Sequence, residues 1–210
     1  MDPKQLVADG YDAMGDAYTA QAVEGRTLDR EWYLDTLSER LQRGTTLLDL
    51  GCGAGIPTTM RLAEDFDVTG VDISPGQIAR ARKNVANARF VTSDIAKVDF
   101  PPDSFDAVTA FFSIVHVPRE EQQAVFRSIV RWLRPGGVFM GSLSASGKGQ
   151  AASYEDDFFG APMYWSNYDA ITNQRMVAEA GLQIVMADQK THDFNDETET
   201  WLWILAKKPA

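Results

Sequence analysis

Cysteine is nearly absent from this 210-residue sequence, and long apolar runs are missing altogether. The single cysteine, Cys52, excludes an internal disulfide framework and is typical of a reducing compartment. No apolar run approaches the roughly 20 residues of a membrane-spanning helix. Residues 1–5 also lack the basic and then apolar layout of a signal peptide. We therefore expect a cytoplasmic globular protein, whose length predicts one domain over residues 1–210.

Basic residues are outnumbered, because 20 Lys and Arg face 30 Asp and Glu and give a formal net charge of −10. Such a surface repels the phosphates of nucleic acids and anionic membranes, and no basic stripe offsets it. We therefore expect a neutral or cationic small molecule as partner, and neither nucleic acid nor membrane. Histidine is scarce too, with only His116 and His192, so no transition-metal site is expected.

The most informative stretch is a glycine-rich turn that follows an apolar run. Residues 47–55 read LLDLGCGAG, which places Gly51, Gly53 and Gly55 at alternate positions. Pro57 then opens a predicted helix, since proline is well tolerated at the first helical position. A strand, a glycine turn and a helix in this order let the backbone approach a ligand closely, because no Cβ stands in the way.

Strand-like and helical segments alternate from this point on, which predicts a parallel sheet with helices on both faces. The predicted strands are 46–51, 67–72, 89–92, 106–113, 138–143, 182–187 and 201–206, and the predicted helices are 57–64, 74–85, 118–133 and 169–180. The last two strands are joined by a polar connection without a helix, so they should pair antiparallel. The fold class is therefore α/β, a Rossmann-like seven-stranded sheet that is mostly parallel and ends in an antiparallel pair.

Two regions stand outside this alternation. Residues 1–44 show helical periodicity in two stretches, with a polar joint over 15–25. Residues 144–149 are flexible by composition, and residues 154–168 are rich in aromatic side chains, among them Tyr164 and Trp165.

The parallel strands should bring their carboxyl ends, and a ligand, to one edge of the sheet. Asp72 ends the second strand, 21 residues after Gly51, and Asp94 follows the third strand after 22 more. Asp72 suits hydrogen bonds to ribose hydroxyls. A dinucleotide is disfavoured, because Ile56 stands where its fingerprint has a third glycine. Asp49 also puts a carboxylate where a pyrophosphate would lie, which suits an ammonium or sulfonium cation better.

Five motifs in register now indicate a family. Their sequences are LDLGCGAG (48–55), GVDIS (70–74), SDI (93–95), SFDAV (104–108) and LRPGG (133–137). This order resembles a class I S-adenosylmethionine-dependent methyltransferase of the small-molecule branch. The resemblance implies methyl transfer from S-adenosylmethionine to oxygen or nitrogen of a small acceptor, with S-adenosylhomocysteine as the product. It also implies a helical lid over 1–44, a cofactor-binding core over 45–143, an acceptor-pocket segment over 144–180 and a closing strand pair over 181–210.

The resemblance assigns roles by position. Asp72 would hold the ribose, Asp94 the adenine amino group, and the backbone carbonyl of Phe111 the methionine ammonium, while Tyr11 and Tyr18 would belong to the lid. The full set of implied cofactor contacts is Tyr11, Tyr18, Asp49, Gly51, Cys52, Gly53, Asp72, Ile73, Gln77, Asp94, Ile95 and Phe111. Tyr164 and Trp165 would form a wall of the acceptor pocket.

Several of these residues also have a purely structural interpretation. Asp49 could hold the glycine turn by accepting from its amides, Asp94 could cap a loop, and Cys52 could pack as a small hydrophobe. The two lid tyrosines could be ordinary helix packing. The aromatic segment 154–168 could be core beneath a long loop.

His116 follows the fourth strand, where it could accept a proton from the acceptor, or could bond backbone at the start of the helix after Pro118. His192 falls in the polar connection with Asp193 and Asp196, where we expect it to be solvated. Two rival functions remain: a non-catalytic cofactor-binding partner protein and a nicotinamide-dependent oxidoreductase. The sequence leaves the acceptor, the methylated atom and the oligomeric state undecided.

Overall fold

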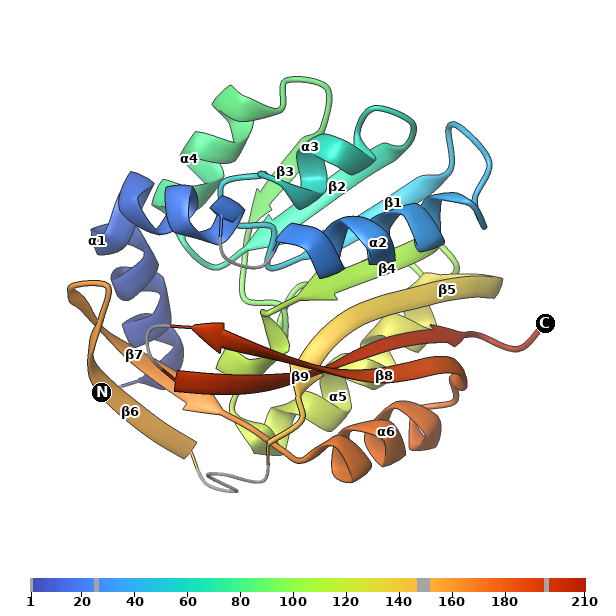
Figure 1. Ribbon diagram of the computed structural model, residues 1–210. Coiled ribbons are helices and arrows are strands. Elements are labelled where there is room, and N and C mark those ends of the chain that lie inside the picture. The colour runs from blue at the N-terminus through green and yellow to red at the C-terminus, as the bar shows by residue number, and fades with distance from the viewer. Residues whose placement is uncertain (1, 25–26, 147–151, 195–196) are drawn as a thin grey trace.

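The computed structural model describes residues 2–24, 27–146, 152–194 and 197–210, and its centre is a seven-stranded sheet (Figure 1). The strand order is β3-β2-β1-β4-β5-β9-β8. The strands are β1 (Thr46–Leu50), β2 (Asp67–Asp72), β3 (Arg89–Thr92), β4 (Phe105–Phe111), β5 (Leu133–Ser144), β8 (Gln183–Phe194) and β9 (Glu197–Lys207). Strands β1 to β5 pair in parallel, and β9 pairs antiparallel with β5 and β8. The predicted fold class is confirmed.

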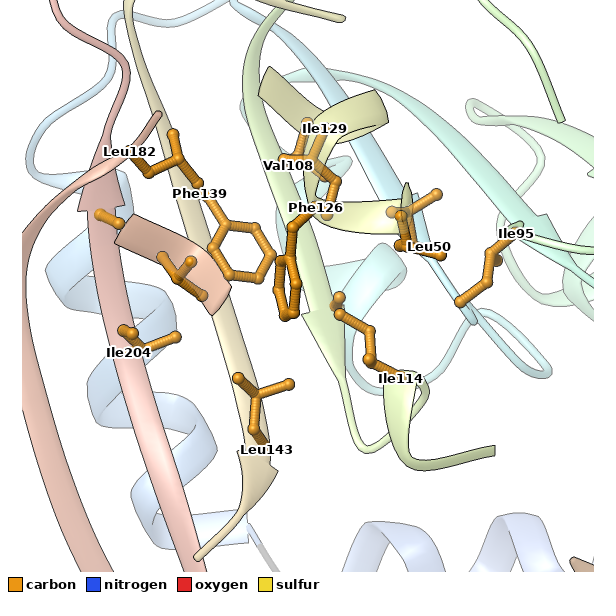
Figure 2. Packing of buried hydrophobic residues seen from close by; sticks show 14 of the residues in the cluster. Leu50, Ile95, Val108, Ile114, Phe126, Ile129, Phe139, Leu143, Leu182 and Ile204 are labelled. Atoms are coloured by element: carbon orange, nitrogen blue, oxygen red, sulfur yellow. The ribbon is translucent and has the colours of Figure 1, made fainter. Parts of the chain in front are cut away.

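Helices cover both faces of this sheet. They are α1 (Pro3–Glu24), α2 (Thr27–Ser38), α3 (Thr58–Leu62), α4 (Pro75–Asn84), the 3₁₀ turn η1 (Ile114–His116), α5 (Arg119–Trp132) and α6 (Ala170–Glu179). Helices α5 and α6 pack on one face, and α2 and α3 pack on the other. Neighbouring strand residues therefore enter different cores: Phe139 faces α5, where it meets Phe126 (Figure 2), whereas Met140 joins the α2 side.

The N-terminal region is more helical than its polar composition predicts. Helix α1 runs from Pro3 to Glu24, and Gly15 inside it has a non-helical backbone with φ 54° and ψ −129°. The expected joint over 15–25 is therefore a kink at one glycine, which tolerates positive φ without a Cβ penalty. Residue 25 lies outside the described residues.

The segment after β5 holds an unpredicted hairpin, β6 (Ala152–Phe158) and β7 (Ala161–Ser166), paired antiparallel. Its inner residues, Phe158, Met163 and Tyr164, form a third apolar cluster with Val7 and Met14 of α1. Part of the aromatic segment is therefore buried, as one of the two interpretations expected. It is buried between the hairpin and α1 (Figure 1). Residues 147–149, predicted to be flexible, lie outside the described residues.

The closing strands are longer than predicted, because β8 and β9 extend through most of the expected polar connection. His192 consequently lies on β8 and not in a loop, with Nε2 2.5 Å from a carboxylate oxygen of Asp29, and its side chain is 37% exposed. Asp196 lies outside the described residues.

Candidate functional site

A cavity of about 1040 Å³, including the solvent space at its mouth, lies at the carboxyl ends of the parallel strands. All twelve residues predicted as cofactor contacts line it, and so does His116. The site also sits where the strand order reverses between β1 and β4, which is the position expected for a ligand in an open α/β sheet.

The strand order fixes the order of side chains along the cavity. Asp94 follows β3, Asp72 ends β2, Gly51 follows β1, and Phe111 ends β4. Because β3, β2, β1 and β4 are successive neighbours, these four positions form one row across the cavity floor. An elongated ligand would meet them in that sequence.

Asp72 is a buried carboxylate held by two backbone amides, with 8% of its surface exposed. Its Oδ2 accepts from the Gly53 amide at 2.8 Å, and its Oδ1 accepts from the Ser74 amide at 2.9 Å. Burial raises the pKa of Asp72 to about 6, because its effect outweighs that of the two amide hydrogen bonds, which lower the pKa. The side chain is thus fixed in place at the end of β2.

Gln77 connects the sheet edge to the N-terminal helix. Ser74 caps α4 by accepting from the Gln77 amide at 2.9 Å, as the sequence predicts. The Gln77 side chain does not complete a capping box, because its Nε2 donates to the Tyr11 carbonyl at 3.1 Å. Its Oε1 is buried and has no hydrogen-bond partner within the described part of the chain.

Asp49 lies beneath the glycine turn and is 2% exposed. It accepts from the Thr59 hydroxyl at 2.6 Å and from the Thr109 hydroxyl at 2.8 Å. The turn is held instead by the Val71 carbonyl of β2, which accepts from the Gly51 amide at 2.7 Å. The interpretation of Asp49 as the clamp of the glycine turn is therefore wrong, and burial raises the pKa of this carboxyl.

Cys52 is buried in the turn, and burial, followed by the charges of Asp72 and Asp49, raises the pKa of its thiol well above the usual value. The thiolate is therefore disfavoured, which agrees with the packing interpretation of this residue and not with a nucleophile.

Asp94 is both a loop cap and an ion-pair partner. Its Oδ1 accepts from the Ala96 amide at 2.8 Å, and its Oδ2 lies 2.7 Å from Nζ of Lys4. Lys4 also pairs with Glu121 at the start of α5. The capping interpretation is thus present in the structure, together with an unpredicted cation from α1 on the cavity wall.

Two hydrogen bonds of the His116 ring, each 2.8 Å long, fix its position. Nδ1 meets the backbone carbonyl of Tyr164, and Nε2 meets the Tyr11 hydroxyl. A carbonyl only accepts, so Nδ1 carries the hydrogen, and in the neutral ring Nε2 accepts from Tyr11. The expected alternative, a bond to backbone at the start of the helix after Pro118, is therefore wrong, because the partner carbonyl belongs to β7.

The two residues expected to wall the acceptor pocket are not among those that line the cavity. Trp165 lies behind His116, with ring centroids 4.5 Å apart, and its indole donates to Glu155 at 2.9 Å. Tyr164 reaches His116 only through its carbonyl. Both are one layer removed from the cavity, because β7 runs behind η1 and presents its backbone to His116.

Helix α1 covers the cavity through polar contacts that the sequence did not predict. Asp12 accepts from the Gly76 amide at 2.9 Å and bonds the Ser74 hydroxyl, so a carboxylate sits at the N-terminus of α4. Tyr11 and Tyr18 both line the cavity, with ring centroids 4.9 Å apart.

Arg30 of α2 is a second cation on the cavity wall that sequence reasoning missed. Only 6% of it is exposed, and its guanidinium lies over the Phe112 ring, 5.2 Å from the centroid. A signal was available: Arg30 precedes the apolar Tyr33 and Leu34 by three and four residues, which puts it on their face of the helix.

Two further findings concern metal binding and membrane spans. Within the ranges that the structure describes, no group of three or more His, Cys, Asp or Glu side chains could hold a metal ion. In the same ranges, none of the helices has both the length and the apolar character needed to cross a membrane.

Comparison with known proteins now adds to this geometry. The sequence profile described as "Methyltransferase domain" matches residues 47–137. Phosphoethanolamine N-methyltransferase 3 from Arabidopsis thaliana is 28% identical over 161 residues, which cover 73% of this chain and 32% of the relative. 2-Methyl-6-phytyl-1,4-hydroquinone methyltransferase from Synechocystis is 39% identical over 113 residues, which cover 51% of this chain and 33% of the relative. The chain thus spans about one third of the length of these curated relatives.

A solved structure agrees in fold. N-methyltransferase NodS from Bradyrhizobium japonicum, in complex with S-adenosyl-L-homocysteine, superposes with a TM-score of 0.70 at 19% identity. The match covers 90% of this chain and 91% of NodS. At this identity the likeness concerns the fold alone. The profile match shows that residues 47–137 carry a methyltransferase domain, whose five motifs resemble those of the class I S-adenosylmethionine-dependent enzymes.

Proposed function

We propose that this protein transfers a methyl group from S-adenosylmethionine to an oxygen or nitrogen of a small-molecule acceptor and releases S-adenosylhomocysteine. The observation that carries the proposal is the row formed by Asp94, Asp72, Gly51 and Phe111 along one cavity floor. Such a row suits adenine, ribose and amino-acid groups in that order. The small-molecule class is supported by the named activities of the two relatives and by the net charge of −10.

Two local features fit the nucleoside. Gln77 Oε1 is a buried acceptor that lacks a partner among the described side chains and backbone, and a ribose hydroxyl would supply the missing donor. Gly53 has φ 54°, and a Cβ built on it would meet nothing within 4 Å, so the backbone there is open to a ligand. Asp72, fixed by two amides, keeps further lone pairs for the ribose.

When bound, S-adenosylmethionine supplies a methyl group already activated by a sulfonium, so no strong nucleophile is required of the protein. The chain's own tasks are to align the acceptor and to exclude water. Helix α1 serves the second task, because Tyr11 and Tyr18 roof the cavity and Asp12 holds the helix on α4. His116 serves a third, as the group that takes the acceptor's proton at Nε2.

The arrangement at His116 supports that role. Its Nδ1–H is held by the Tyr164 carbonyl, which fixes the ring and leaves Nε2 as the basic atom on the cavity side. Tyr11 donates to this same nitrogen, so the acceptor's proton would reach His116 either directly, after Tyr11 turns away, or through the Tyr11 hydroxyl. We also infer a cytoplasmic location, which the single buried thiol supports.

The test is calorimetric titration of the purified protein with S-adenosylhomocysteine and, separately, with NADH. Binding of the first ligand and not the second supports the proposal, whereas the reverse supports the oxidoreductase. A cell extract is then incubated with protein and S-adenosylmethionine and searched by mass spectrometry for a metabolite that gains one methylene. Binding without any such product, in extracts that contain the candidate acceptors, would favour a non-catalytic partner protein.

A further inference from the structure

Trp165 of β7 packs against His116 from the side away from the cavity. The two ring centroids lie 4.5 Å apart with 36° between the ring planes, so the indole turns its face rather than its edge toward the imidazole. His116 lines the cavity, and Trp165 is not among the lining residues. A methyl acceptor in the cavity would therefore meet the imidazole, and the indole can influence the reaction only through that ring.

Contacts within the hairpin hold the indole in this place. Phe158 of β6 meets it edge to face, with ring centroids 5.0 Å apart and 87° between the planes. The indole Nε1 donates to Oε2 of Glu155, also on β6, at 2.9 Å. A hydrogen bond from the indole to a carboxylate polarises the ring and adds electron density to its π system. The His116 ring thus rests on a fixed and electron-rich surface.

Protonation changes the contacts of the His116 ring unequally. Nδ1 already donates to the Tyr164 carbonyl, and this hydrogen bond is kept in the imidazolium. The Tyr11 hydroxyl donates to Nε2, and this bond has to reverse once Nε2 carries a proton. Because the ring is buried, with 8% of the residue exposed, desolvation penalises its charged form. The face of an indole acts in the opposite direction, since its π electrons attract a cation.

We propose that Trp165 is a positioning residue for His116, whose indole face holds the imidazole and stabilises it after it takes the acceptor's proton. This rests on the proposed function, in which His116 is the base. The acceptor gives its proton to Nε2 and uses the freed electron pair to bond the methyl carbon, whose bond to sulfur breaks with its pair left on sulfur. The positive charge thereby passes from sulfur to the His116 ring, which the indole faces. Glu155 contributes through the indole.

Other charged and titratable groups around the ring have to be separated from this effect. The Tyr11 hydroxyl faces the ring from α1, and Glu155 lies behind the indole on β6. The charged side chains that line the same cavity are Lys4, Arg30, Asp49, Asp72 and Asp94. All of these except Glu155 keep their identity in the variants below, so differences between the variants report on the indole and on Glu155.

The test is an NMR titration of the ligand-free protein that measures the pH at which half of the His116 rings are protonated. The chain has only two histidines, so a His192→Gln background leaves a single imidazole signal. Trp165→Leu should lower the half-protonation pH by roughly 0.4–1.5 pH units, the size of a cation–π interaction with tryptophan. Trp165→Phe, which keeps a smaller aromatic face, and Glu155→Gln should each lower it by less. Trp32→Leu, at an exposed tryptophan of α2, is the control and should leave it unchanged.

A loss of packing alone predicts the opposite sign, because water entering beside the ring favours the imidazolium and raises the half-protonation pH. A rise or no change in Trp165→Leu would therefore overturn the proposal. An equal fall in Glu155→Gln would overturn it too, since the charge of the carboxylate would then act on His116 directly. If Trp165→Leu does not fold, the same outcomes in Trp165→Phe decide the question. The titration needs no nucleoside, so a failure to bind S-adenosylhomocysteine, which would contradict the proposed function, is seen independently of this result.

Discussion

The Tyr11 hydroxyl lies 2.8 Å from Nε2 of His116, and thereby joins the helix that roofs the cavity to the turn that follows β4. Nδ1 of the same ring is held by the Tyr164 carbonyl. The hairpin, the turn and α1 thus meet at one imidazole, whose tautomer is set by the carbonyl and whose Nε2 lone pair accepts from Tyr11.

Replacement of His116 by alanine should slow methyl transfer by roughly 10²- to 10⁴-fold, the usual contribution of a general base. Affinity for S-adenosylhomocysteine should stay close to that of the wild type, since the ring does not belong to the nucleoside row. The measurement is kcat with an acceptor found in the extract screen, beside a binding titration. Tyr11→Phe, which keeps the ring against Tyr18 but removes the hydroxyl, should have a smaller effect. Unchanged turnover in His116→Ala would reject the base role.

Affinity for S-adenosylhomocysteine should fall as the pH drops through about 6. Burial raises the pKa of Asp72 to about 6, and its ionised form is the better acceptor for ribose hydroxyls. A ligand that prefers the ionised carboxylate binds with full affinity above that pKa and progressively less tightly below it. At pH 8, where Asp72 is already ionised, ligand binding should not change the protonation of Asp72. Titrations from pH 5 to pH 8 measure this. Asp72→Asn should bind S-adenosylhomocysteine weakly, and its affinity should show no step near pH 6. A step that persists in this variant would show that another group titrates there.

Two alanine substitutions in the glycine turn should separate folding from binding. Both glycines have positive φ, so each change introduces roughly 1–2 kcal/mol of backbone strain. At Gly51 the new Cβ would lie 2.2 Å from Cβ of Ser113, which adds a clash of about 1–3 kcal/mol, whereas at Gly53 it meets nothing within 4 Å. Denaturant unfolding should show the larger loss for Gly51→Ala. Gly53→Ala should stay folded and lose ligand affinity, because its Cβ enters the cavity; equal stability losses would contradict this.

The ion pairs of Lys4 should hold the first half of α1 on the protein. Burial lowers the pKa of Lys4, but hydrogen bonds to Asp94 and Glu121 outweigh it and raise the pKa above 10.5, so this stabilisation is present below pH 10.5 and is lost as the pH rises further. Lys4→Met should reduce the free energy of unfolding by roughly 1–3 kcal/mol, because the Asp94 carboxylate, only 11% exposed, loses its partner. It should also speed amide hydrogen exchange in residues 3–14. Lys97→Met at an exposed position is the control, and protection equal to the wild type in Lys4→Met would contradict the account.

The parallel core could be predicted from the sequence because its strands are short apolar runs and its turns are marked by Gly, Pro and Asp. The strand limits of β2 and β3 agree with those expected. The hairpin β6–β7 could not be predicted in the same way. Six of the seven residues of β6 are exposed, and they include Glu155, Asp156 and Asp157, which disfavour a strand by propensity. Its pairing depends on β7 and on the apolar face of α1, a tertiary contact that no local pattern records.

In the candidate site, too, residues in local motifs could be predicted, whereas residues placed by tertiary contacts could not. Motif spacing was enough to place Asp72, Gly51 and Gly53 at one cavity. Lys4 and Arg30 were missed because a charged residue in a helix is normally expected to face solvent. Each precedes buried apolar residues by three or four positions, so helical periodicity alone puts them on the inner face, as with Arg30 before Tyr33. Periodicity cannot supply the identity of the partner, which for Lys4 comes from the loop after β3 and from α5.

The central claim is that the row from Asp94 to Phe111 binds an adenosine carrying an amino-acid tail. Its most direct test is a crystal structure of the protein grown with S-adenosylhomocysteine. The account predicts the ribose hydroxyls within hydrogen-bond distance of Asp72, the adenine beside Asp94, and the tail toward Phe111. Density for the nucleoside outside this cavity would contradict the claim. So would the absence of any bound nucleoside from crystals grown at a saturating concentration of S-adenosylhomocysteine.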